Sequence, residues 1–543
     1  MEAAGSTAAA TAAQTAQQRA QPLAQATAQA AAEHPARTAV VVGGGISGLL
    51  AARELARAGV RTTVLEASGA WGGCVGSHVV AGLTLDSGAE SFATRSSAVA
   101  DLAGELGLAA AIVAPNPGGA WVQLPDGPRE LPRTGVLGIP ANPWDPEVRR
   151  SLGLPGSLRA SLDRLLPASL GTGGEAKSVS ALVRARMGRR VLERLVAPVV
   201  GGVHSADPDV LDIDMVAPGL RAGIREHGSL AAAVAAQRRV GTNRVGKNGV
   251  GKNRAGSIGA ENTSAPRSEQ STAGPSAGAS PGGLQKAGSA VAGLRGGMHT
   301  LVSALLSELR GQGVTLLNDT RADAVERTAG GWRVSAGGTA HDASLLVVAV
   351  EGPAAVDLLA AALPDLARHR PEAGPDVSLV TLVVNLPPLD SRPRGTGVLV
   401  APQSPGIQAK ALTHATAKWA WLADQAGPGT HVLRLSYGRG DVRHGRPARP
   451  EPRTDDALFA AALQDASALL SVPVTAGDVV DWDVVRWGGA LPFASLGHKR
   501  RVAQVRSLCA ADGNLAVVGG WLSGNGLAAI VDDTPKQVRP LLS

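Results

Sequence analysis

The chain has 543 residues, of which 44% are hydrophobic and 18% charged, a composition that is typical of a globular protein and excludes a disordered one. Its two cysteines, Cys74 and Cys509, exclude a disulfide framework and a metal site made of cysteines alone. The formal net charge is +7, but residues 237–286 carry eight Lys and Arg against two Glu, so the rest of the chain is close to neutral and does not indicate nucleic-acid binding. The 11 histidines show no HxH or HExxH spacing, so no metal site is expected.

Two segments lack the pattern of folded structure. Residues 1–36 consist mainly of Ala and Gln and are predicted to be a disordered tail. Residues 238–286 are basic and of low complexity, and a linker is predicted because they bury too little apolar surface to offset the entropy of ordering. No apolar run reaches the roughly 18 residues of a membrane span, and the N-terminus lacks a signal pattern. A cytoplasmic protein without a transmembrane segment is therefore expected, with peripheral membrane contact left open.

Outside these two segments, strand and helix patterns alternate. In chain order, the patterns predict a strand at 38–42, a helix at 47–58, a strand at 62–65, a helix-rich stretch over 140–237 with one helix at 178–200, a helix at 298–310, strands at 314–317, 332–335 and 345–350, several strands within 377–439, and a strand at 515–518. This order indicates an α/β protein in which one domain is assembled from separated pieces of the chain, with other domains inserted between them.

A glycine-rich turn follows the first predicted strand. It consists of Gly43, Gly44, Gly45, Ile46, Ser47 and Gly48 and matches the pattern GxGxxG. The pattern alone is weak in a glycine-rich chain, but here a strand precedes it, a helix follows it, and Glu66 ends the next strand, which is the arrangement of a dinucleotide-binding unit. The glycines let a pyrophosphate approach the backbone at the positive end of the helix dipole, and Glu66 can accept hydrogen bonds from a ribose.

NAD and FAD both use such a unit, and more distant segments favour FAD. Gly72 and Gly73 follow Glu66 closely, and the segment 85–92 (LDSGAESF) comes next. Near the C-terminus, the strand at 515–518 leads into 521–527 (WLSGNGL) and a helix, whose first N–H groups suit the pyrimidine end of an isoalloxazine ring. A chain whose C-terminal end returns to the cofactor bound near its N-terminus suits the long FAD molecule.

The sequence resembles the flavin oxidases with a monoamine-oxidase-type fold and, among them, the HemY-type porphyrinogen oxidases of haem synthesis. Monoamine oxidases and carotenoid desaturases share only the motifs at the two ends, so the middle motifs discriminate. The segments that carry the resemblance are 88–96 (GAESFATRS), 132–140 (PRTGVLGIP), 188–208 (GRRVLERLVAPVVGGVHSADP), 293–305 (GLRGGMHTLVSAL), 397–402 (GVLVAP), 414–419 (HATAKW), 486–492 (RWGGALP) and 497–498 (GH). The low aromatic content resembles the actinobacterial branch, whose substrate is coproporphyrinogen III.

The resemblance implies a set of FAD contacts. Contacts to adenine, ribose and pyrophosphate fall on the glycine turn, Glu66, Ala67 and Ala322. Contacts to the flavin fall on Gly73, Cys74, Gly88, Ala89, Glu90, Ser91, Trp487, Asn525, Gly526 and Leu527. Relatives often carry Lys, Arg or Trp at position 74, and Cys74 is interpreted as a small buried residue. The family's PQY is replaced by 491–494 (LPFA), so a substrate role for its Gln or Tyr is not carried over.

No catalytic side chain is named, because the flavin accepts hydride while the protein supplies orientation and excludes water. The resemblance implies a six-electron oxidation in three rounds, with dioxygen reoxidising the flavin. Cations at the rim of an apolar cavity would bind the propionates of the substrate. The candidate cations are Arg95, Arg133, Lys418 and Arg434. For each of them the alternative is a solvated charge on the surface without a ligand contact. His498 is interpreted as a structural hydrogen-bonding residue, with a proton relay as the alternative.

The expected fold is therefore α/β, with a discontinuous Rossmann-type FAD-binding domain, an inserted mixed-sheet substrate domain and a helical domain. The expected boundaries are 37–112, 287–370 and 500–543 for the FAD-binding domain, 113–139 and 371–499 for the substrate-binding domain, and 140–237 for the helical domain.

The leading functional hypothesis is FAD-dependent oxidation of coproporphyrinogen III to coproporphyrin III with dioxygen as the acceptor. The alternatives are a protoporphyrinogen IX oxidase, an amine oxidase or desaturase on the same fold, and a flavin- or porphyrin-binding protein without turnover. An amine oxidase would need an aromatic cage around the amine, and the single Tyr437 with three Phe makes such a cage poor.

Overall fold

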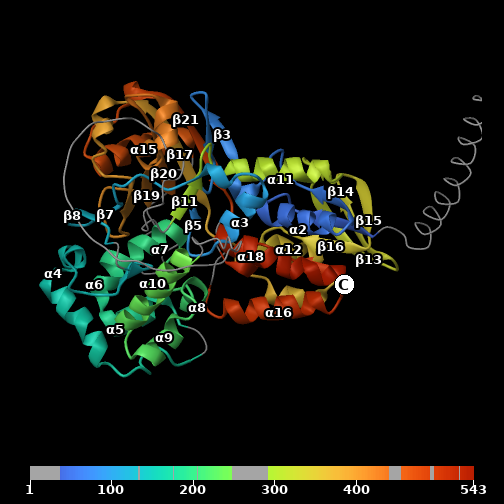
Figure 1. Ribbon diagram of the computed structural model, residues 1–543, viewed down its shortest axis with the longest axis horizontal. Helices are drawn as coiled ribbons and strands as arrows, with labels where there is room; N and C mark the ends of the chain where they lie inside the picture. The colour runs from blue at the N-terminus through green and yellow to red at the C-terminus, as the bar shows by residue number, and fades with distance from the viewer. Residues whose placement is uncertain are drawn as a thin grey trace, which may run out of the picture.

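The computed structural model describes residues 37–132, 135–174, 177–204, 206–247, 291–438, 454–489, 495–524 and 526–543. The tail 1–36, most of the segment 238–286, the segment 491–494, and the site candidates Arg133 and Asn525 lie outside the described residues. Among the described residues, no helix combines the length and the apolar character that crossing a membrane requires. The described chain forms three units: a parallel sheet with its helices, a mixed sheet, and a group of helices (Figure 1).

The first unit is built on a five-stranded parallel sheet. Its strands, in spatial order, are β12 (Thr315–Leu317), β2 (Arg61–Leu65), β1 (Thr38–Val42), β16 (Leu345–Val348) and β22 (Leu515–Val517). They come from both ends and from the middle of the chain, so the unit is discontinuous. The apolar runs of β1 and β16 are buried almost throughout, as a parallel sheet covered on both faces requires.

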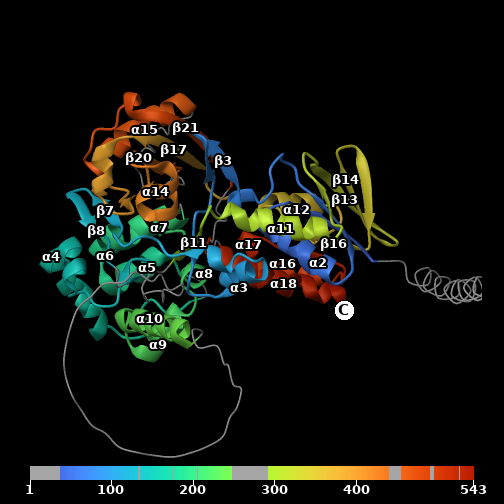
Figure 2. The ribbon, with the colours of Figure 1, turned by 45° about the horizontal axis from the view of Figure 1, so that its top comes forward.

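Helices cover one face of this sheet and a small antiparallel sheet with two further helices covers the other. The first face, with Val41, Leu49 and Leu305 in its core, is covered by α2 (Ile46–Arg57), α11 (His299–Gly311) and α18 (Leu527–Val538). The second face, with Val40 and Trp332 in its core, is covered by α12 (Gly352–Leu359), α16 (His498–Ala510) and the strands β13 (Ala322–Thr328), β14 (Gly331–Ala336) and β15 (Thr339–Ala343). The small sheet stands at the end of the unit that is farthest from the mixed sheet (Figure 2).

The second unit is a seven-stranded mixed sheet. Its strands, in spatial order, are β21 (Val479–Trp487), β17 (Val377–Asn385), β20 (Thr430–Tyr437), β19 (Ala411–His414), β18 (Gly397–Val400), β7 (Trp121–Leu124) and β8 (Gly127–Glu130), and only the β18–β7 pair is parallel. One face packs on α15 (Asp455–Leu470). The other face packs on α13 (Ala415–Lys418), α14 (Ala420–Ala426) and the hairpin of β3 (Ser77–Val80) and β4 (Leu83–Asp86), which reaches over from the first unit.

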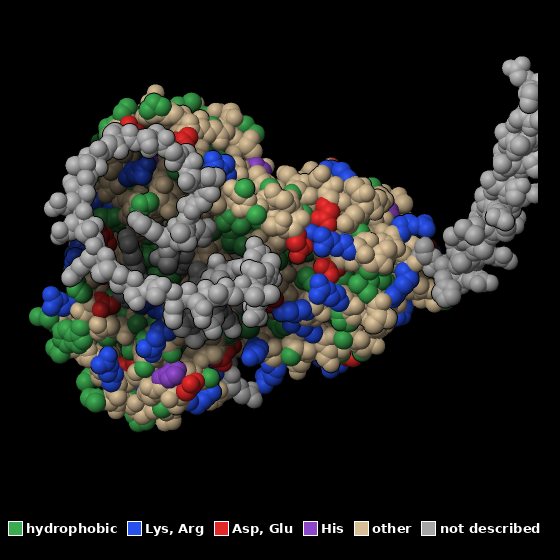
Figure 3. Space-filling view, viewed as in Figure 1, with side chains coloured by type: hydrophobic (Ala, Val, Ile, Leu, Met, Phe, Trp, Pro, Cys, Tyr) green, Lys and Arg blue, Asp and Glu red, His purple; other side chains and the backbone are tan. Residues whose placement is uncertain are grey.

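The third unit is helical and lies beside both sheets (Figures 1 and 2). It contains α4 (Pro146–Ser161), α5 (Val179–Met187), α6 (Arg189–Val191), α7 (Ala197–His204), α8 (Ile213–Val216), α9 (Leu220–His227) and α10 (Leu230–Lys247). Helix α7 lies against β18 so closely that a Cβ on Gly202 would be 2.5 Å from Cδ2 of Leu399. At the outer end, near α4, hydrophobic side chains gather on the surface (Figure 3). They include the exposed Leu154, Leu158, Leu162 and Leu165, which give this unit an apolar outer surface.

Short elements join the units. They are β5 (Phe92–Ala93), α3 (Ala98–Glu105), β6 (Ile112–Val113), β9 (Gly135–Val136), β10 (Ile139–Pro140), β11 (Val291–Leu294) and α17 (Gly520–Ser523). Strand β11 pairs with both β5 and β6, so the chain that re-enters the first unit after residue 290 is paired at once with its N-terminal part.

The predicted α/β fold class, with a parallel and a mixed sheet, is confirmed. Two predicted elements differ from the structure. The helix expected over 178–200 breaks at Gly188, where φ is +89° and a Cβ would lie 2.7 Å from Cγ of Arg159, so that only glycine fits. Helix α10 continues to Lys247, whereas the sequence places the start of the linker at residue 238.

Candidate flavin site

The glycine turn between β1 and α2 forms an open cradle. Gly43 has φ +107°, and a Cβ on Gly48 would lie 1.8 Å from the carbonyl oxygen of Gly43, so the turn closes only with glycines at both positions. A Cβ on Gly45, in contrast, would meet no atom within 4 Å. The first N–H groups of α2 have no partners within the helix and point toward this open side, where the helix dipole favours an anion. The predicted contacts Ile46 and Ser47 are themselves buried.

Glu66 is fixed beside this cradle. Its Oε2 accepts a hydrogen bond from the backbone N–H of Gly44 at 2.6 Å, and its Oε1 accepts hydrogen bonds from the N–H and the hydroxyl of Ser68 at 2.8 and 2.7 Å. A carboxylate has about four lone-pair sites and three are used here, so Glu66 can also accept from one ribose hydroxyl. Sequence reasoning missed Ser68, which orients Glu66; a hydroxyl two residues after an acid at a strand end is the local signal.

The loops that follow the parallel strands meet at one edge of the sheet, as the carboxyl ends of parallel strands must. Backbone hydrogen bonds tie the turn to its neighbours: Gly43 N donates to Leu65 O at 2.8 Å, and Ala349 N donates to Val42 O at 2.7 Å. Thr320 N donates to Glu66 O at 2.8 Å, which brings the predicted adenine contact Ala322 to the side of the loop that begins with Glu66 and Ala67.

The predicted flavin contacts near the N-terminus are tied to the glycine turn by backbone hydrogen bonds. Gly72 N donates to Gly44 O at 2.9 Å, and Ala89 N donates to Cys74 O at 2.8 Å, so residues 72–74 lie between the glycine turn and the loop 87–91. A Cβ on Gly88 would be 2.1 Å from Cys74 O. The Cys74 side chain, in the 3₁₀ turn Gly73–Val75, is exposed, which corrects the prediction that it is buried.

The distant flavin candidates reach the same region from other elements. Trp487, at the end of β21, donates a hydrogen bond from Nε1 to the carbonyl of Ser87 at 2.9 Å. Gly526 is the N-cap residue and Leu527 the first residue of α18, which packs on α2. Trp487 thus ties the end of the mixed sheet to the loop 87–91, and Leu527 and Ala89 pack against the same core as α2.

Lys418 and Arg434, two of the proposed substrate cations, both contact Glu90, a proposed flavin contact. Lys418 Nζ is ion-paired with Glu90 Oε1, and Arg434 Nη1 lies 3.3 Å from Glu90 Oε2. Arg434 Nη2 also donates to the carbonyl of Gly88 at 2.6 Å. Burial alone would raise the pKa of Glu90, but the charges of Lys418 and Arg434 outweigh it and hold that pKa below its ordinary value.

Arg95, the third proposed substrate cation, is not part of this cluster. Arg95 is exposed on the surface just after β5, and Arg133 lies outside the described residues. The exposure of Arg95 therefore favours its interpretation as a solvated surface charge.

His498 and Asp86 have structural hydrogen bonds near the site. His498 Nε2 lies 2.6 Å from the carbonyl oxygen of Trp521 and links α16 to α17, and burial lowers the pKa of this histidine, as suits a neutral structural residue. Asp86 Oδ2 accepts from Met298 N at 2.9 Å, and its Oδ1 accepts from His299 N at 3.0 Å. Asp86 thus caps α11 and holds it to the start of the loop 87–91. Sequence reasoning missed this contact, which has no local signal.

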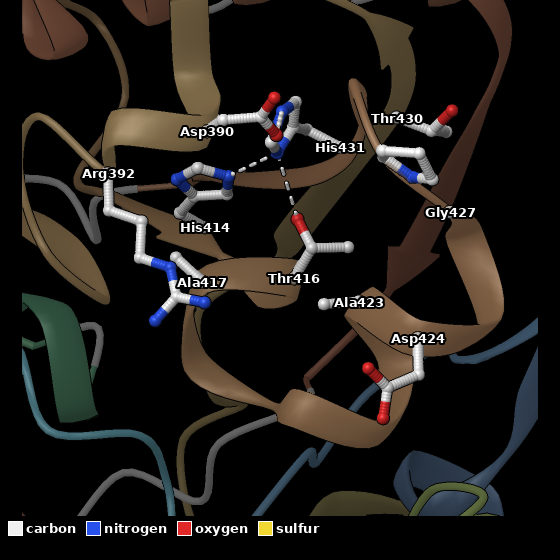
Figure 4. Close-up of a pocket in the computed structure, with 11 residues that line it drawn as sticks. Asp390, Arg392, His414, Thr416, Ala417, Ala423, Asp424, Gly427, Thr430 and His431 are labelled. Carbon is white, nitrogen blue, oxygen red and sulfur yellow. Dashed lines mark hydrogen bonds and ion pairs between the residues drawn. The ribbon is translucent and has the colours of Figure 1, made fainter. Parts of the chain in front are cut away.

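A separate pocket of about 390 Å³ lies at one end of the mixed sheet (Figure 4). His414 and His431 face each other there, with Nε2 of the first 3.0 Å from Nδ1 of the second, and Nε2 of His431 lies 3.2 Å from Asp390 Oδ1. Burial, assisted by the charges of His431 and Arg392, lowers the pKa of His414 to about 3. In the part of the chain that the structure describes, no group of three or more His, Cys, Asp or Glu side chains could hold a metal ion.

Comparison with known proteins places the chain in a family. The family model for flavin containing amine oxidoreductases matches residues 46–534. The chain is 32% identical over 501 residues to coproporphyrinogen III oxidase of Propionibacterium freudenreichii subsp. freudenreichii, covering 91% of this chain and 88% of that protein. It is 30% identical over 512 residues to coproporphyrinogen III oxidase of Mycobacterium leprae, covering 93% and 98%.

Solved structures share the fold. A crystal structure of a candidate protoporphyrinogen oxidase from Exiguobacterium sp. matches with a TM-score of 0.70 at 22% identity and covers 93% of this chain and 98% of that one. Cyclohexylamine oxidase from Brevibacterium oxydans matches with a TM-score of 0.57 at 16% identity and covers 94% and 99%.

The residues present fit FAD, because the cradle is open only at Gly45 and Glu66 is fixed at its side. The predictions of a flavin oxidase and of FAD as its cofactor are confirmed. The chain belongs to the flavin-containing amine oxidoreductase family and is an FAD-dependent oxidoreductase.

Proposed function

We propose that this protein oxidises coproporphyrinogen III to coproporphyrin III, with dioxygen as the acceptor. The observation that carries the proposal is the extent of the matches. Coproporphyrinogen III oxidases of actinobacteria match more than 90% of this chain. Protoporphyrinogen oxidase 2 of Arabidopsis thaliana is 30% identical over 36% of the chain, the same share that coproporphyrinogen III oxidase of Staphylococcus aureus covers at 32% identity. The full-length similarity therefore favours the coproporphyrinogen substrate.

The reaction balances with three molecules of dioxygen. Coproporphyrinogen III loses six hydrogens, in three rounds of two, and each round reduces one dioxygen to hydrogen peroxide. FAD, when bound, accepts a hydride in each round and passes the electrons on. The chain's own residues bind and orient: the glycine turn and Glu66 hold the dinucleotide, and the loop 87–91 with Trp487 positions the flavin end.

Lys418 and Arg434 support a substrate that bears carboxylates. Lys418 reaches the loop 87–91 from α13 and Arg434 from β20, and with Glu90 between them the cluster carries a net positive charge. Charge-assisted hydrogen bonds to carboxylates are stronger than neutral ones, so such a cluster suits propionate groups. We infer that the mixed sheet and the helical unit form the walls of the substrate chamber, and that the parallel sheet holds the cofactor.

Tyr437 argues against the amine-oxidase alternative. It is the only tyrosine of the chain, and it lies buried between the mixed sheet and α15, where its hydroxyl donates to Asp465 at 3.2 Å. This is the opposite face of the sheet from Lys418 and Arg434, because alternate residues of a strand point to opposite faces. Tyr437 is therefore not part of an aromatic cage at the flavin.

Anaerobic reduction of the flavin tests the proposal. The purified holoenzyme is mixed with coproporphyrinogen III, protoporphyrinogen IX or a primary amine, and bleaching of the flavin absorbance band is followed. Fast bleaching by coproporphyrinogen III and slower bleaching by protoporphyrinogen IX are expected. Faster bleaching by protoporphyrinogen IX would overturn the choice of substrate, and bleaching by the amine alone would overturn the reaction class. A yellow protein that none of them bleaches would favour a carrier without turnover.

A further inference from the structure

Glu90 is the anion at the centre of a buried three-membered ion cluster. The side chains of Glu90, Lys418 and Arg434 are 16%, 15% and 10% exposed, respectively. They come from three different elements: the loop between β4 and β5, the end of α13, and the middle of β20. A charge buried to this extent costs free energy unless it is paired, and here two cations share a single carboxylate.

The two cations are held in different ways. Arg434 donates to the carbonyl of Gly88 as well as to Glu90, so its planar guanidinium is fixed by two acceptors. Lys418 contacts Glu90 and lies 5.0 Å from the centre of the Trp419 ring. A lysine ammonium is a point charge on a flexible stem, so Lys418 can turn to another anion while Glu90 stays paired with Arg434.

We propose that Glu90 is an internal counter-ion, a specificity-determining residue whose place on Lys418 is taken by a carboxylate of the incoming substrate. The inference rests on the proposed function for the identity of that substrate. Binding then exchanges one carboxylate for another, so the cluster keeps its pairing throughout. A ligand without a carboxylate gains nothing from the exchange. The competition from Glu90 also weakens binding of the correct ligand, which lets the equally charged product leave.

The proposal makes an unusual prediction for Glu90→Gln, which keeps the size of the side chain and removes its charge. Both cations lose their competing anion, so coproporphyrin III is expected to bind about tenfold more tightly. An ordinary structural ion cluster predicts the reverse, because removing its anion leaves two buried cations unpaired and loosens the site. In turnover, the KM for coproporphyrinogen III should fall, and kcat should fall with it as product release slows.

Equilibrium binding to the FAD-loaded enzyme is the test, with flavin content measured in every variant. Coproporphyrin III is titrated by quenching of its fluorescence, and its tetramethyl ester, which has no carboxylates, is the matched ligand control. The variants are Glu90→Gln, Lys418→Met and the double variant, with Asp357→Asn as an exposed carboxylate control paired to Arg370. We expect tighter binding of the acid in Glu90→Gln, weaker binding in Lys418→Met, no tightening in the double variant, and the same ester affinity in all of them.

Three results would overturn the proposal: weaker or unchanged binding of coproporphyrin III to flavin-loaded Glu90→Gln, equal tightening for the ester, or tightening that persists without Lys418. If Glu90→Gln does not fold, Lys418→Met tests the proposal instead. Unchanged binding of coproporphyrin III by Lys418→Met would show that Lys418 does not bind a substrate carboxylate and would overturn the proposal. A wild type that binds coproporphyrin III but is not reduced by coproporphyrinogen III would refute the proposed function and leave the counter-ion role to be decided by the same titrations.

Discussion

Trp487, the last residue of strand β21, donates a hydrogen bond from its indole Nε1 to the carbonyl oxygen of Ser87, 2.9 Å away on the loop that contains Glu90. The two residues are 400 positions apart, and Trp487 belongs to the mixed sheet whereas Ser87 is on the loop after β4. The bond fixes the mixed sheet against the loop on which the flavin contacts are predicted, so the position of the loop depends on the docking of the second unit.

Trp487→Phe keeps an aromatic ring and removes this donor. One hydrogen bond of this kind contributes about 1 kcal/mol, so the dissociation constant of FAD is expected to rise about fivefold. The measurement is the fluorescence of flavin released on dilution. Trp482→Phe is the matched control, because Trp482 lies on the same strand and stacks on Phe459 at 4.5 Å. Equal flavin release by the two variants would show that the hydrogen bond of Trp487 does not contribute to FAD binding.

Gly45→Val is expected to yield folded but colourless protein. Gly45 has φ −68°, which valine accepts, and its Cβ would have no protein neighbour within 4 Å, so the side chain projects only into the open cradle. There it blocks the approach of the pyrophosphate. The ratio of flavin to protein absorbance measures the loss. Gly330→Val, at a position that is equally open, should keep the wild-type ratio. Stoichiometric flavin in Gly45→Val would contradict the assignment of the cradle as the pyrophosphate site.

Lys418→Ala should weaken turnover of the four-propionate substrate more than that of the two-propionate one. Coproporphyrinogen III carries the larger negative charge, so loss of a cation at the site costs it more. We expect kcat/KM to fall about tenfold for coproporphyrinogen III and less for protoporphyrinogen IX, measured as initial oxygen consumption. Equal losses on both substrates would remove Lys418 from the selectivity of the enzyme.

His414 is expected to make the protein sensitive to acid. Its pKa is lowered from 6.5 to about 3 in the folded protein. Between these values the unfolded chain binds a proton that the folded chain does not, so the stability contributed above pH 6.5 is lost as the pH falls toward 3. At pH 5 the loss from this group is on the order of 2 kcal/mol.

The difference in urea unfolding midpoint between pH 7.5 and pH 5.0 measures this loss. It should be smaller in His414→Gln than in wild type, and unchanged in His341→Gln, which replaces a histidine on β15 of the small sheet. An acid-induced shift of the same size in His414→Gln would contradict the prediction.

The helical unit depends on one buried ion pair. Arg186 Nε donates to Asp163 Oδ1 at 2.6 Å, both side chains are fully buried, and Asp163 Oδ2 also accepts from Ala231 N at 2.8 Å. Arg186→Met leaves the carboxylate unpaired and should destabilise the protein by about 3–5 kcal/mol, read as a lower thermal midpoint. Arg189→Met, which breaks an exposed pair with Glu193, should leave that midpoint unchanged. Similar melting of the two variants would show that the buried pair is not what holds this unit.

The sequence alone predicted the parts of the site that backbone sterics dictate locally. The glycine turn needs glycine at Gly43 and Gly48 because the chain approaches itself there, and the position of Glu66 follows from the length of the next strand. The family resemblance extended this to the flavin loop and to candidate substrate cations. The sequence pattern also predicted the α/β fold, because the alternation of strands and helices is a local property of the chain.

Only the tertiary structure decided how the distant residues pair. Sequence reasoning assigned Glu90 to the flavin and Lys418 to the substrate, whereas the two form one ion pair across 328 positions of the chain. The cap that Asp86 provides for α11 spans 213 positions. Such contacts depend on how three units dock, and docking is set by the packing of whole faces, which no local pattern encodes. The resemblance gave Arg95 and Lys418 as equal candidates for substrate cations. In the structure Arg95 is exposed. The exposure and the partners of a side chain are set by the folded chain, so the sequence could not distinguish the two.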